Sequence, residues 1–148
     1  EYLSKQNSTD CAGLDFGCGP APALANELNQ NGYLMDVYDP YYFPNHQLLN
    51  TRYDFVTCTE VVEHFNDPKH SFEILLSLLK PNAVIVIMTK MVINKERFKT
   101  WHYKNDPTHI SFFSRKTFEF IVKQQNLDNI LTLEFLGNDV IMIYKSEQ

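Results

Sequence analysis

The chain contains few cysteines and few glycines, and it has no long hydrophobic run. Its 148 residues include three cysteines and five glycines. An odd number of cysteines without a C-x-x-C spacing argues against a disulfide framework and against a thiolate zinc site. No apolar run approaches the roughly 18 residues of a membrane-spanning helix, and the amino end does not resemble a signal peptide. We therefore expect a cytoplasmic protein with reduced thiols and without a membrane partner.

Internal repeats, low-complexity tracts and Gly/Ser linkers are also absent from the sequence. A chain of this length suits one domain with a single core. Hydrophobic residues make up 44% of the chain and aromatic residues 14%, which is well above the content of a disordered chain. We expect residues 1–148 to form a single packed domain.

Basic residues are concentrated in one segment, although the net charge of the whole chain is −5. Seven Lys or Arg and only two acids lie between Lys90 and Lys116. An acidic chain disfavours non-specific binding to nucleic acid, whereas this local excess of positive charge can attract an anionic small molecule. The same lysines are equally compatible with a solvated loop.

Short apolar runs alternate with helical patterns in the first part of the chain. Runs that are typical of buried strands lie at residues 12–16, 33–38, 55–59 and 83–88. Residues 20–31 and 68–80 place apolar side chains at helical spacing, and Asp67-Pro68 supplies a cap and a first-turn proline. Two β-α-β units of this kind predict a parallel sheet that is covered on both faces.

The pattern changes after the fourth of these strands. Residues 89–113 predict a long loop, and Ser114 opens a further helix. Residues 130–136 and 140–144 flank a Gly137-Asn138 turn, which predicts an antiparallel hairpin. The expected fold is therefore α/β: a Rossmann-like, doubly wound and mostly parallel sheet with an antiparallel C-terminal hairpin.

The stretch G-L-D-F-G-C-G-P at residues 13–20 ends the first strand with two glycines. Gly17 and Gly19 allow a ligand to approach the backbone, and the helix that follows points free N–H groups at an anionic group. Asp39 ends the next strand 22 residues after Gly17, where a carboxylate can accept hydrogen bonds from both hydroxyls of a ribose. The pattern predicts a nucleoside-containing cofactor. Pro22 replaces the third glycine of the dinucleotide fingerprint, which disfavours NAD.

Several motifs, in this order, resemble those of the class I S-adenosylmethionine-dependent methyltransferases. The similar segments are L-D-F-G-C-G-P, V-Y-D-P, Y-D-F-V-T-C-T-E-V-V-E-H-F-N-D-P, L-L-K-P-N and D-P-T-H-I-S-F-F-S. The resemblance covers about residues 12–122 and is to the small-molecule type, similar to the ubiquinone-pathway O-methyltransferases. It implies that S-adenosylmethionine is the cofactor and that its methyl group passes to a small-molecule acceptor, at oxygen.

The resemblance also implies a set of cofactor-binding residues. The residues that would surround the methionine portion are Asp15, Gly17, Cys18 and Gly19. The ribose would be held by Asp39 and Pro40, and the pocket would be lined from the adjacent strand by Cys58, Thr59 and Glu60.

Two parts of the family pattern are shortened in this chain. About 14 residues separate Asp39 from Asp54, where the family usually fits a third strand, so this strand is expected to be short or missing. Tyr41-Tyr42-Phe43 is then a candidate for stacking on the adenine. Only 10 residues precede the first predicted strand, so the amino-terminal helices that often cover the site are expected to be missing as well.

A hydroxyl acceptor must lose its proton to a positioned base or to a metal. The candidate catalytic residues are His109, with Asp106 to orient it, and His64. A helical conformation of residues 60–64 would place Glu60, Glu63 and His64 on one face. The pattern E-x-x-E-H is similar to the metal-binding segment of the ubiquinone-pathway and small-RNA 2′-O-methyltransferases. We expect no metal, and the candidate set, if one binds, is Glu60, Glu63, His64 and His109.

Other interpretations stay open at this point. Trp101, Tyr103, Phe112 and Phe113 either form an aromatic wall for the acceptor or pack a loop. A separate metal site at His102, Asp106 and His109 has weak support, because loop spacing fixes no geometry. The alternatives to a small-molecule methyltransferase are a non-catalytic domain that binds the cofactor or a partner, and an RNA 2′-O-methyltransferase, against which the net acidity counts.

Overall fold

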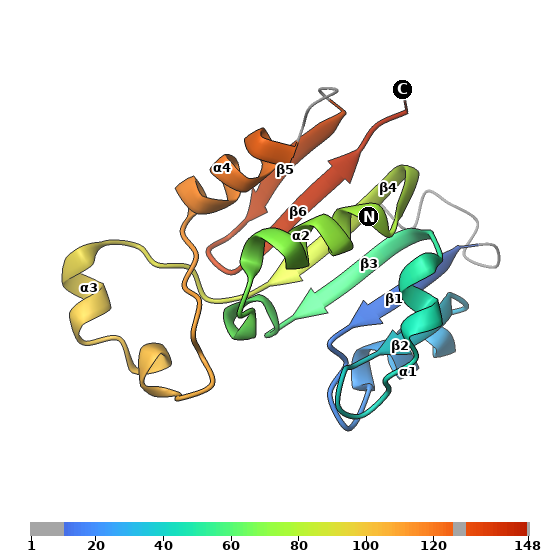
Figure 1. The fold of residues 1–148 in the computed structure, drawn as a ribbon, viewed down its shortest axis with the longest axis horizontal. Coiled ribbons are helices and arrows are strands. Elements are labelled where there is room, and N and C mark those ends of the chain that lie inside the picture. The colour runs from blue at the N-terminus through green and yellow to red at the C-terminus, as the bar shows by residue number, and fades with distance from the viewer. Residues whose placement is uncertain (1–10, 126–129, 148) are drawn as a thin grey trace.

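One mixed sheet organises the computed structural model, which describes residues 11–125 and 130–147 (Figure 1). Its strands are β1 (Ala12–Phe16), β2 (Leu34–Tyr38), β3 (Tyr53–Thr59), β4 (Leu79–Met88), β5 (Leu131–Leu136) and β6 (Val140–Lys145), in the order β2-β1-β3-β4-β6-β5. The first four strands are parallel, whereas β6 runs antiparallel to both β4 and β5. The predicted α/β fold and its antiparallel C-terminal hairpin are thereby confirmed.

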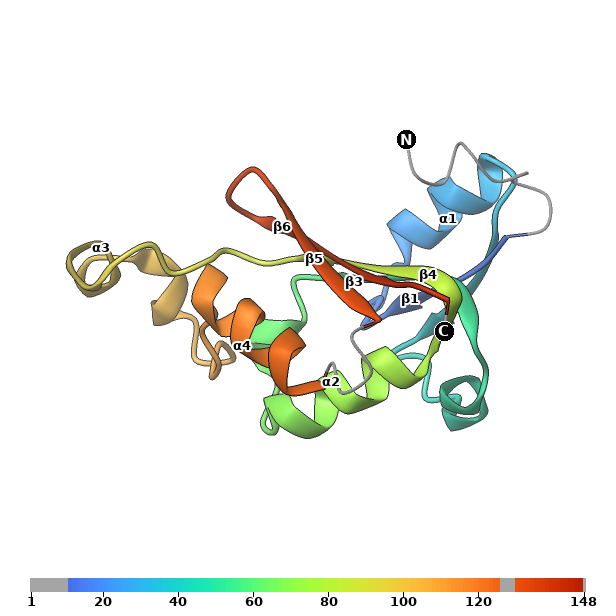
Figure 2. The same cartoon turned by 90° about the horizontal axis from the view of Figure 1, so that it is seen from above.

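Helices lie on both faces of this sheet. Figure 2 shows α1 (Ala23–Gln30) on one face and both α2 (Pro68–Ser77) and α4 (Arg115–Gln125) on the other. The expected loop after β4 instead contains the short helix α3 (Lys95–Lys99) and the 3-10 helix η5 (His102–Asn105). This segment, residues 91–113, extends away from the sheet beyond the carboxyl end of β4 in Figure 1. In the part of the chain that the structure describes, no helix is long and apolar enough to cross a bilayer.

The start of α2 follows the sequence prediction, but its end does not. Asp67 caps the helix by accepting a hydrogen bond from the His70 amide at 3.1 Å, and Pro68 occupies the first turn. The helix ends at Ser77, short of the predicted Lys80, because the residue before Pro81 disfavours helical backbone. Asn82 then takes a positive φ of 60°, which asparagine tolerates, near the start of β4, where the pairing with β3 is irregular.

The third strand that the family pattern led us to question is missing. Between β2 and β3 the described chain contains an isolated bridge from Asp39 to Phe43 and the 3-10 helix η3 (His46–Asn50). Strand β2 is therefore an edge strand of the sheet, and β1 lies between it and β3. The direction of winding reverses between β1 and β3, and in α/β sheets ligands bind outside the carboxyl ends of the strands at such a reversal.

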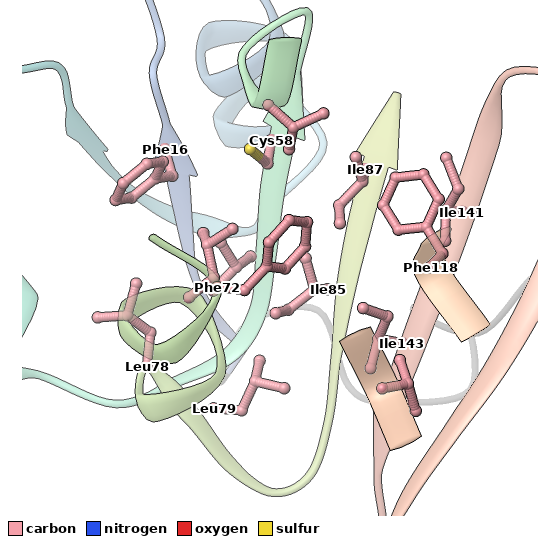
Figure 3. Close-up of a cluster of buried hydrophobic side chains, with 14 of the residues drawn as sticks. Phe16, Cys58, Phe72, Leu78, Leu79, Ile85, Ile87, Phe118, Ile141 and Ile143 are labelled. Carbon is pink, nitrogen blue, oxygen red and sulfur yellow. The ribbon is translucent and has the colours of Figure 1, made fainter. Parts of the chain in front are cut away.

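The largest cluster of buried apolar side chains fills the space between the sheet and the face that carries α2 and α4 (Figure 3). Phe72 of α2 is fully buried there and packs edge-on against the rings of Phe65 and Phe118, at centroid distances of 6.0 Å each. Burial of such aromatic side chains supplies most of the driving force that holds the helices on the sheet. This core therefore fixes the positions of the carboxyl ends of the strands.

Candidate functional site

The turn after β1 contains two glycines, of which Gly17 is closely packed and Gly19 is open to its surroundings. Gly17 and Gly19 have positive φ values of 78° and 65°. A Cβ atom on Gly17 would lie 2.4 Å from the side chain of Val61, so the chain that follows β3 leaves no room for a side chain at this position. A Cβ on Gly19 would meet no atom within 4 Å. The space above Gly19 is therefore available to a ligand.

The carboxylate of Asp39 connects this turn to the end of β2. Its Oδ2 accepts a hydrogen bond from the Gly19 amide at 3.1 Å, and its Oδ1 accepts from the amides of Tyr41 and Tyr42. The amides of Gly17 and Cys18 both donate to the Tyr38 carbonyl. The amides of this turn therefore bind the end of β2 and the Asp39 carboxylate.

Asp15 lies beneath the turn and is almost completely buried. Its Oδ1 accepts a hydrogen bond from the Thr57 hydroxyl at 2.7 Å. Burial is the main cause that raises the pKa of this carboxyl, although the Thr57 hydrogen bond opposes the shift. Burial and the charges of Asp15 and Asp39 also raise the pKa of Cys18 to about 11, so this residue is a neutral thiol at physiological pH.

At the end of β3, the prediction for Cys58 is wrong, and Glu60 has an unusual backbone conformation. Cys58 was expected to line the cofactor pocket, but its side chain is fully buried and lies in the core, as Figure 3 shows. The strand alternates its side chains, so Thr59 is the half-buried one. Glu60 follows with a positive φ of 53°, and its amide donates to the Met88 carbonyl at 2.8 Å. Such backbone is uncommon for residues other than glycine and is found at functional sites.

A buried carboxylate, Glu63, is the centre of the polar contacts beyond β3. Its side chain is 1% exposed. The hydroxyl of Tyr103 donates to one carboxylate oxygen of Glu63, and the hydroxyl of Thr89 donates to the other at 3.0 Å. The Tyr103 oxygen also lies 3.1 Å from Oε2 of Glu60. Partial burial, followed by the nearby Glu63 charge, raises the pKa of Glu60.

Two histidines lie beside this carboxylate with fixed tautomers. Nδ1 of His64 is 2.9 Å from the Thr108 carbonyl, and Nδ1 of His109 is 2.7 Å from the Tyr103 carbonyl. A carbonyl oxygen can only accept, so each Nδ1 carries the hydrogen and each Nε2 of the neutral ring keeps its lone pair. The ring centroids are 4.9 Å apart. The arrangement provides two neighbouring nitrogen bases.

Glu63, His64 and His109 each offer a ligand atom within 4.8 Å of the other two. Carboxylate and imidazole together suit zinc, manganese or iron, and histidine ligands in metal sites commonly donate their other N–H to a carbonyl. The residues present therefore fit a divalent cation. The helical conformation considered for residues 60–64 does not form, because only Val62–His64 make a 3-10 turn, η4, and Glu60 lies outside this set.

The structure corrects two further expectations about the segment of residues 91–113. Asp106 does not orient His109 through a hydrogen bond, because one carboxylate oxygen caps Thr108 and the other lies 3.8 Å from Nε2 of His109. Phe113 is not part of an aromatic wall, since it is 3% exposed and packs in the core. Trp101 and Phe112 remain together, with ring centroids 6.0 Å apart.

Tyr103 was included among the aromatics of that wall, and its polar role was missed. The hydroxyl of a buried tyrosine needs a partner, but the sequence separates Tyr103 from Glu63 by 40 residues. The E-x-x-E-H pattern was the available signal that acids would gather here. Which tyrosine hydroxyl contacts these acids depends on the conformation of residues 91–113, which local sequence patterns do not determine.

Comparisons with known proteins identify the family of this chain. Residues 1–132 match the family described as "Methyltransferase domain". The chain belongs to this methyltransferase domain family. The methyltransferase domain is 28% identical to a protein named ubiquinone biosynthesis O-methyltransferase from Histophilus somni (strain 2336), over 68% of this chain and 42% of that protein. A relative of the same name from Pectobacterium atrosepticum is 27% identical over 68% of this chain and 40% of the relative. This chain thus spans about two fifths of these relatives.

Solved structures show the same fold for the methyltransferase domain. An S-adenosylmethionine-dependent methyltransferase from Archaeoglobus fulgidus superposes with a TM-score of 0.69 at 18% identity, over 94% of this chain and 88% of the other. Magnesium protoporphyrin IX methyltransferase from Synechocystis PCC 6803, with bound S-adenosylhomocysteine, gives 0.69 at 16% identity, over 97% and 78%. The fold is that of the class I S-adenosylmethionine-dependent methyltransferases.

The burial of Asp15 predicts a pH-dependent stability change in Asp15→Asn. The folded pKa is raised, so the native state holds the proton more tightly than the unfolded state, and stability falls as pH rises through the interval above 3.8. Removing the charge should therefore stabilise the fold at pH 7 and give no gain near pH 3. Urea unfolding at both pH values measures this, with the exposed Asp36→Asn as the control. An equal gain at both pH values would contradict the burial argument.

Tyr103→Phe should destabilise the domain, because Glu63 loses one of its two hydroxyl donors while it remains buried. An unsatisfied buried polar group of this kind costs about 1–3 kcal/mol. Guanidinium unfolding measures the loss, and Tyr42→Phe, at a ring that is 57% exposed, serves as the matched control. Equal stability of the two variants would show that the hydroxyl contributes nothing to the fold.

Proposed function

We propose that this domain is an S-adenosylmethionine-dependent methyltransferase that transfers the methyl group to an oxygen of a small-molecule acceptor. The observation that carries the proposal is that the open turn at Gly19 and the acid and histidine cluster around Glu63 both follow carboxyl ends of strands, where Val61 lies against Gly17. The turn would receive the cofactor, and the cluster would receive the acceptor.

The cofactor is expected to lie across the carboxyl ends of β1 and β2. Its methionine portion would occupy the space at Asp15 and above Gly19, where no side chain is present. Its ribose would lie at Asp39 and Pro40. Oδ1 of Asp39 already accepts from two amides and Oδ2 from one, so Oδ2 keeps one lone pair for a ribose hydroxyl. The exposed rings of Tyr41 and Tyr42 adjoin this position and stay candidates for the adenine contact.

Methyl transfer places few demands on the protein beyond position and proton removal. The sulfonium is already a good leaving group, so the acceptor oxygen must be held in line with the methyl carbon in a site from which water is excluded. The oxygen must also lose its proton, and the free Nε2 of His109 or His64 is suited to accept it. In the neutral rings, the carbonyl partners fix the hydrogen on Nδ1 and orient the lone pair of each Nε2.

A divalent cation is compatible with the same cluster. Glu63, His64 and His109 would hold it. When bound, such a cation would lower the pKa of an acceptor hydroxyl. The two histidines would then act as ligands, and Glu60, which Tyr103 connects to Glu63, would be the remaining carboxylate near the acceptor.

Two lines of support point to oxygen as the acceptor atom. The relatives from Histophilus and Pectobacterium are named as O-methyltransferases. The cluster supplies bases for a hydroxyl proton, whereas the lone pair of a neutral amine can attack the methyl group without prior proton removal. Because this chain spans only part of those relatives, their acceptor is not carried over.

The open space at Gly19 yields a test of cofactor binding with a matched control. Gly19→Ala should weaken the binding of S-adenosylmethionine and S-adenosylhomocysteine at least tenfold, because the alanine side chain would project into the proposed cofactor site. Gly137→Ala has the same left-handed backbone and equally open surroundings but lies in the β5–β6 turn. Both variants pay about 1–2 kcal/mol for that backbone, so the difference between them reports on the ligand alone. Isothermal titration calorimetry with a chelator present measures both affinities, and equal values would exclude the site.

The proton-acceptor role of His109 is tested by His109→Gln. Loss of the base should lower kcat for a hydroxyl acceptor about 100-fold or more and leave the affinity for S-adenosylmethionine unchanged. His102→Gln, in the same segment, is the control. Assays with a chelator and with added Mg²⁺, Mn²⁺ or Zn²⁺ separate a base from a metal ligand, since only a ligand variant is rescued by excess metal. Cofactor binding without transfer to any acceptor of a broad panel would instead support a non-catalytic domain.

A further inference from the structure

A cavity of about 720 Å³ lies beside the chain that follows β4. It is formed where residues 91–98 leave the end of β4 and pass the start of α4 and the β5–β6 turn. The residues that line it are Met91, Val92, Ile93, Asn94, Lys95, Phe98, Ser114, Arg115, Lys116 and Asn138. The proposed cofactor-binding, catalytic and metal-binding residues are not among them.

The charge of this cavity is entirely positive. Lys95, Arg115 and Lys116 line it, and no Asp or Glu is among the lining residues. The ion pairs found in residues 11–125 and 130–147 use other cations, as Lys99 does with the neighbouring Glu96. Three cations without acidic partners around one cavity create a local positive potential on an acidic protein, which favours an anionic ligand.

Arg115 is held in place at the wall of the cavity. Its guanidinium lies 4.5 Å from the ring centroid of Phe135 and donates a hydrogen bond to the Gly137 carbonyl. These two contacts use one face and one of the five N–H donors, so further donors remain for a ligand. A fixed guanidinium binds the oxygens of a carboxylate or phosphate with little loss of side-chain entropy.

The rest of the cavity wall is apolar. Met91 is buried, Phe98 is half-buried, and Ile93 remains 62% exposed. The same three side chains also line a smaller cavity with Trp101 on the other side of the segment. Covering the exposed part of Ile93 with a hydrocarbon group would be favourable at roughly 25 cal/mol per Å². The cavity therefore combines an anion site with an apolar surface.

The cavity also lies within reach of the acid and histidine cluster. Thr89 donates to Glu63, and Met91 follows only two residues later. Two residues of extended chain span about 7 Å. We infer that this cavity binds the carboxylate or phosphate end of an amphipathic ligand, with Arg115, Lys95 and Lys116 on the anion and Met91, Ile93 and Phe98 on the apolar body. That the ligand is the methyl acceptor rests on the proposed function, whereas the site itself does not.

The test uses octyl phosphate below its micelle concentration, with inorganic phosphate and the uncharged octyl glucoside as comparison probes. Octyl phosphate should bind at least tenfold more tightly than either, because only it offers both the anion and the chain. Arg115→Gln should weaken its binding at least tenfold, whereas Lys123→Gln, which removes an exposed cation from the same helix outside the cavity, should not. NMR chemical-shift titration without cofactor measures these affinities.

Ile93→Ser provides the second arm, because its side chain is largely exposed and its replacement should leave the fold intact. It should weaken octyl phosphate and leave inorganic phosphate unchanged. Equal binding of octyl phosphate to Arg115→Gln and Lys123→Gln, equal binding of octyl glucoside, or no binding at all would overturn the inference. Calorimetry with S-adenosylmethionine on the same samples tests the proposed function separately: loss of cofactor binding with retained octyl phosphate binding would leave the cavity as an anion site and remove its role for a methyl acceptor.

Discussion

The burial of one carboxylate at the end of the sheet determines how the functional end of the molecule is built. Glu63 is removed from water, and a buried acid is tolerated only if its oxygens find donors. Its side chain takes the hydroxyls of Tyr103 and Thr89, and its own carbonyl accepts from the amides of Ile110 and Ser111 at 2.9 Å each. A single residue thus binds β4, η5 and the chain before α4. The histidine pair and the cation-lined cavity are positioned by the segment that Glu63 holds.

Asp39 plays a corresponding part on the cofactor side. Its carboxylate joins the turn after β1 to the chain after β2. Buried hydrogen bonds to an ionised acceptor are stronger than those between neutral groups. The domain therefore keeps a defined edge at β1 and β2 although its sheet is shorter there, and Gly19 stays accessible above it.

The sequence predicted the scaffold well because its signals are local. Strand hydrophobicity and the Asp67-Pro68 helix start each depend on a few neighbouring residues. The helical conformation considered for residues 60–64 does not form, since Glu60 takes a positive φ of 53° after the end of β3. The burial of Cys58 could not be separated from pocket lining, since strand parity is invisible when both faces are apolar. Tyr103 was missed because its partner is distant in sequence.

The anchoring of residues 91–113 at one carboxylate also has a consequence for local opening. The amides of Ile110 and Ser111 donate to the Glu63 carbonyl, and the amide of Val92 donates to the Phe113 carbonyl at the other end of the segment. Groups that are held by the same few contacts lose protection from hydrogen exchange together, as one cooperative unit. These three amides should exchange with a shared opening free energy below that of the central strands, so the segment and the Glu63 contacts detach as a unit while the sheet remains intact.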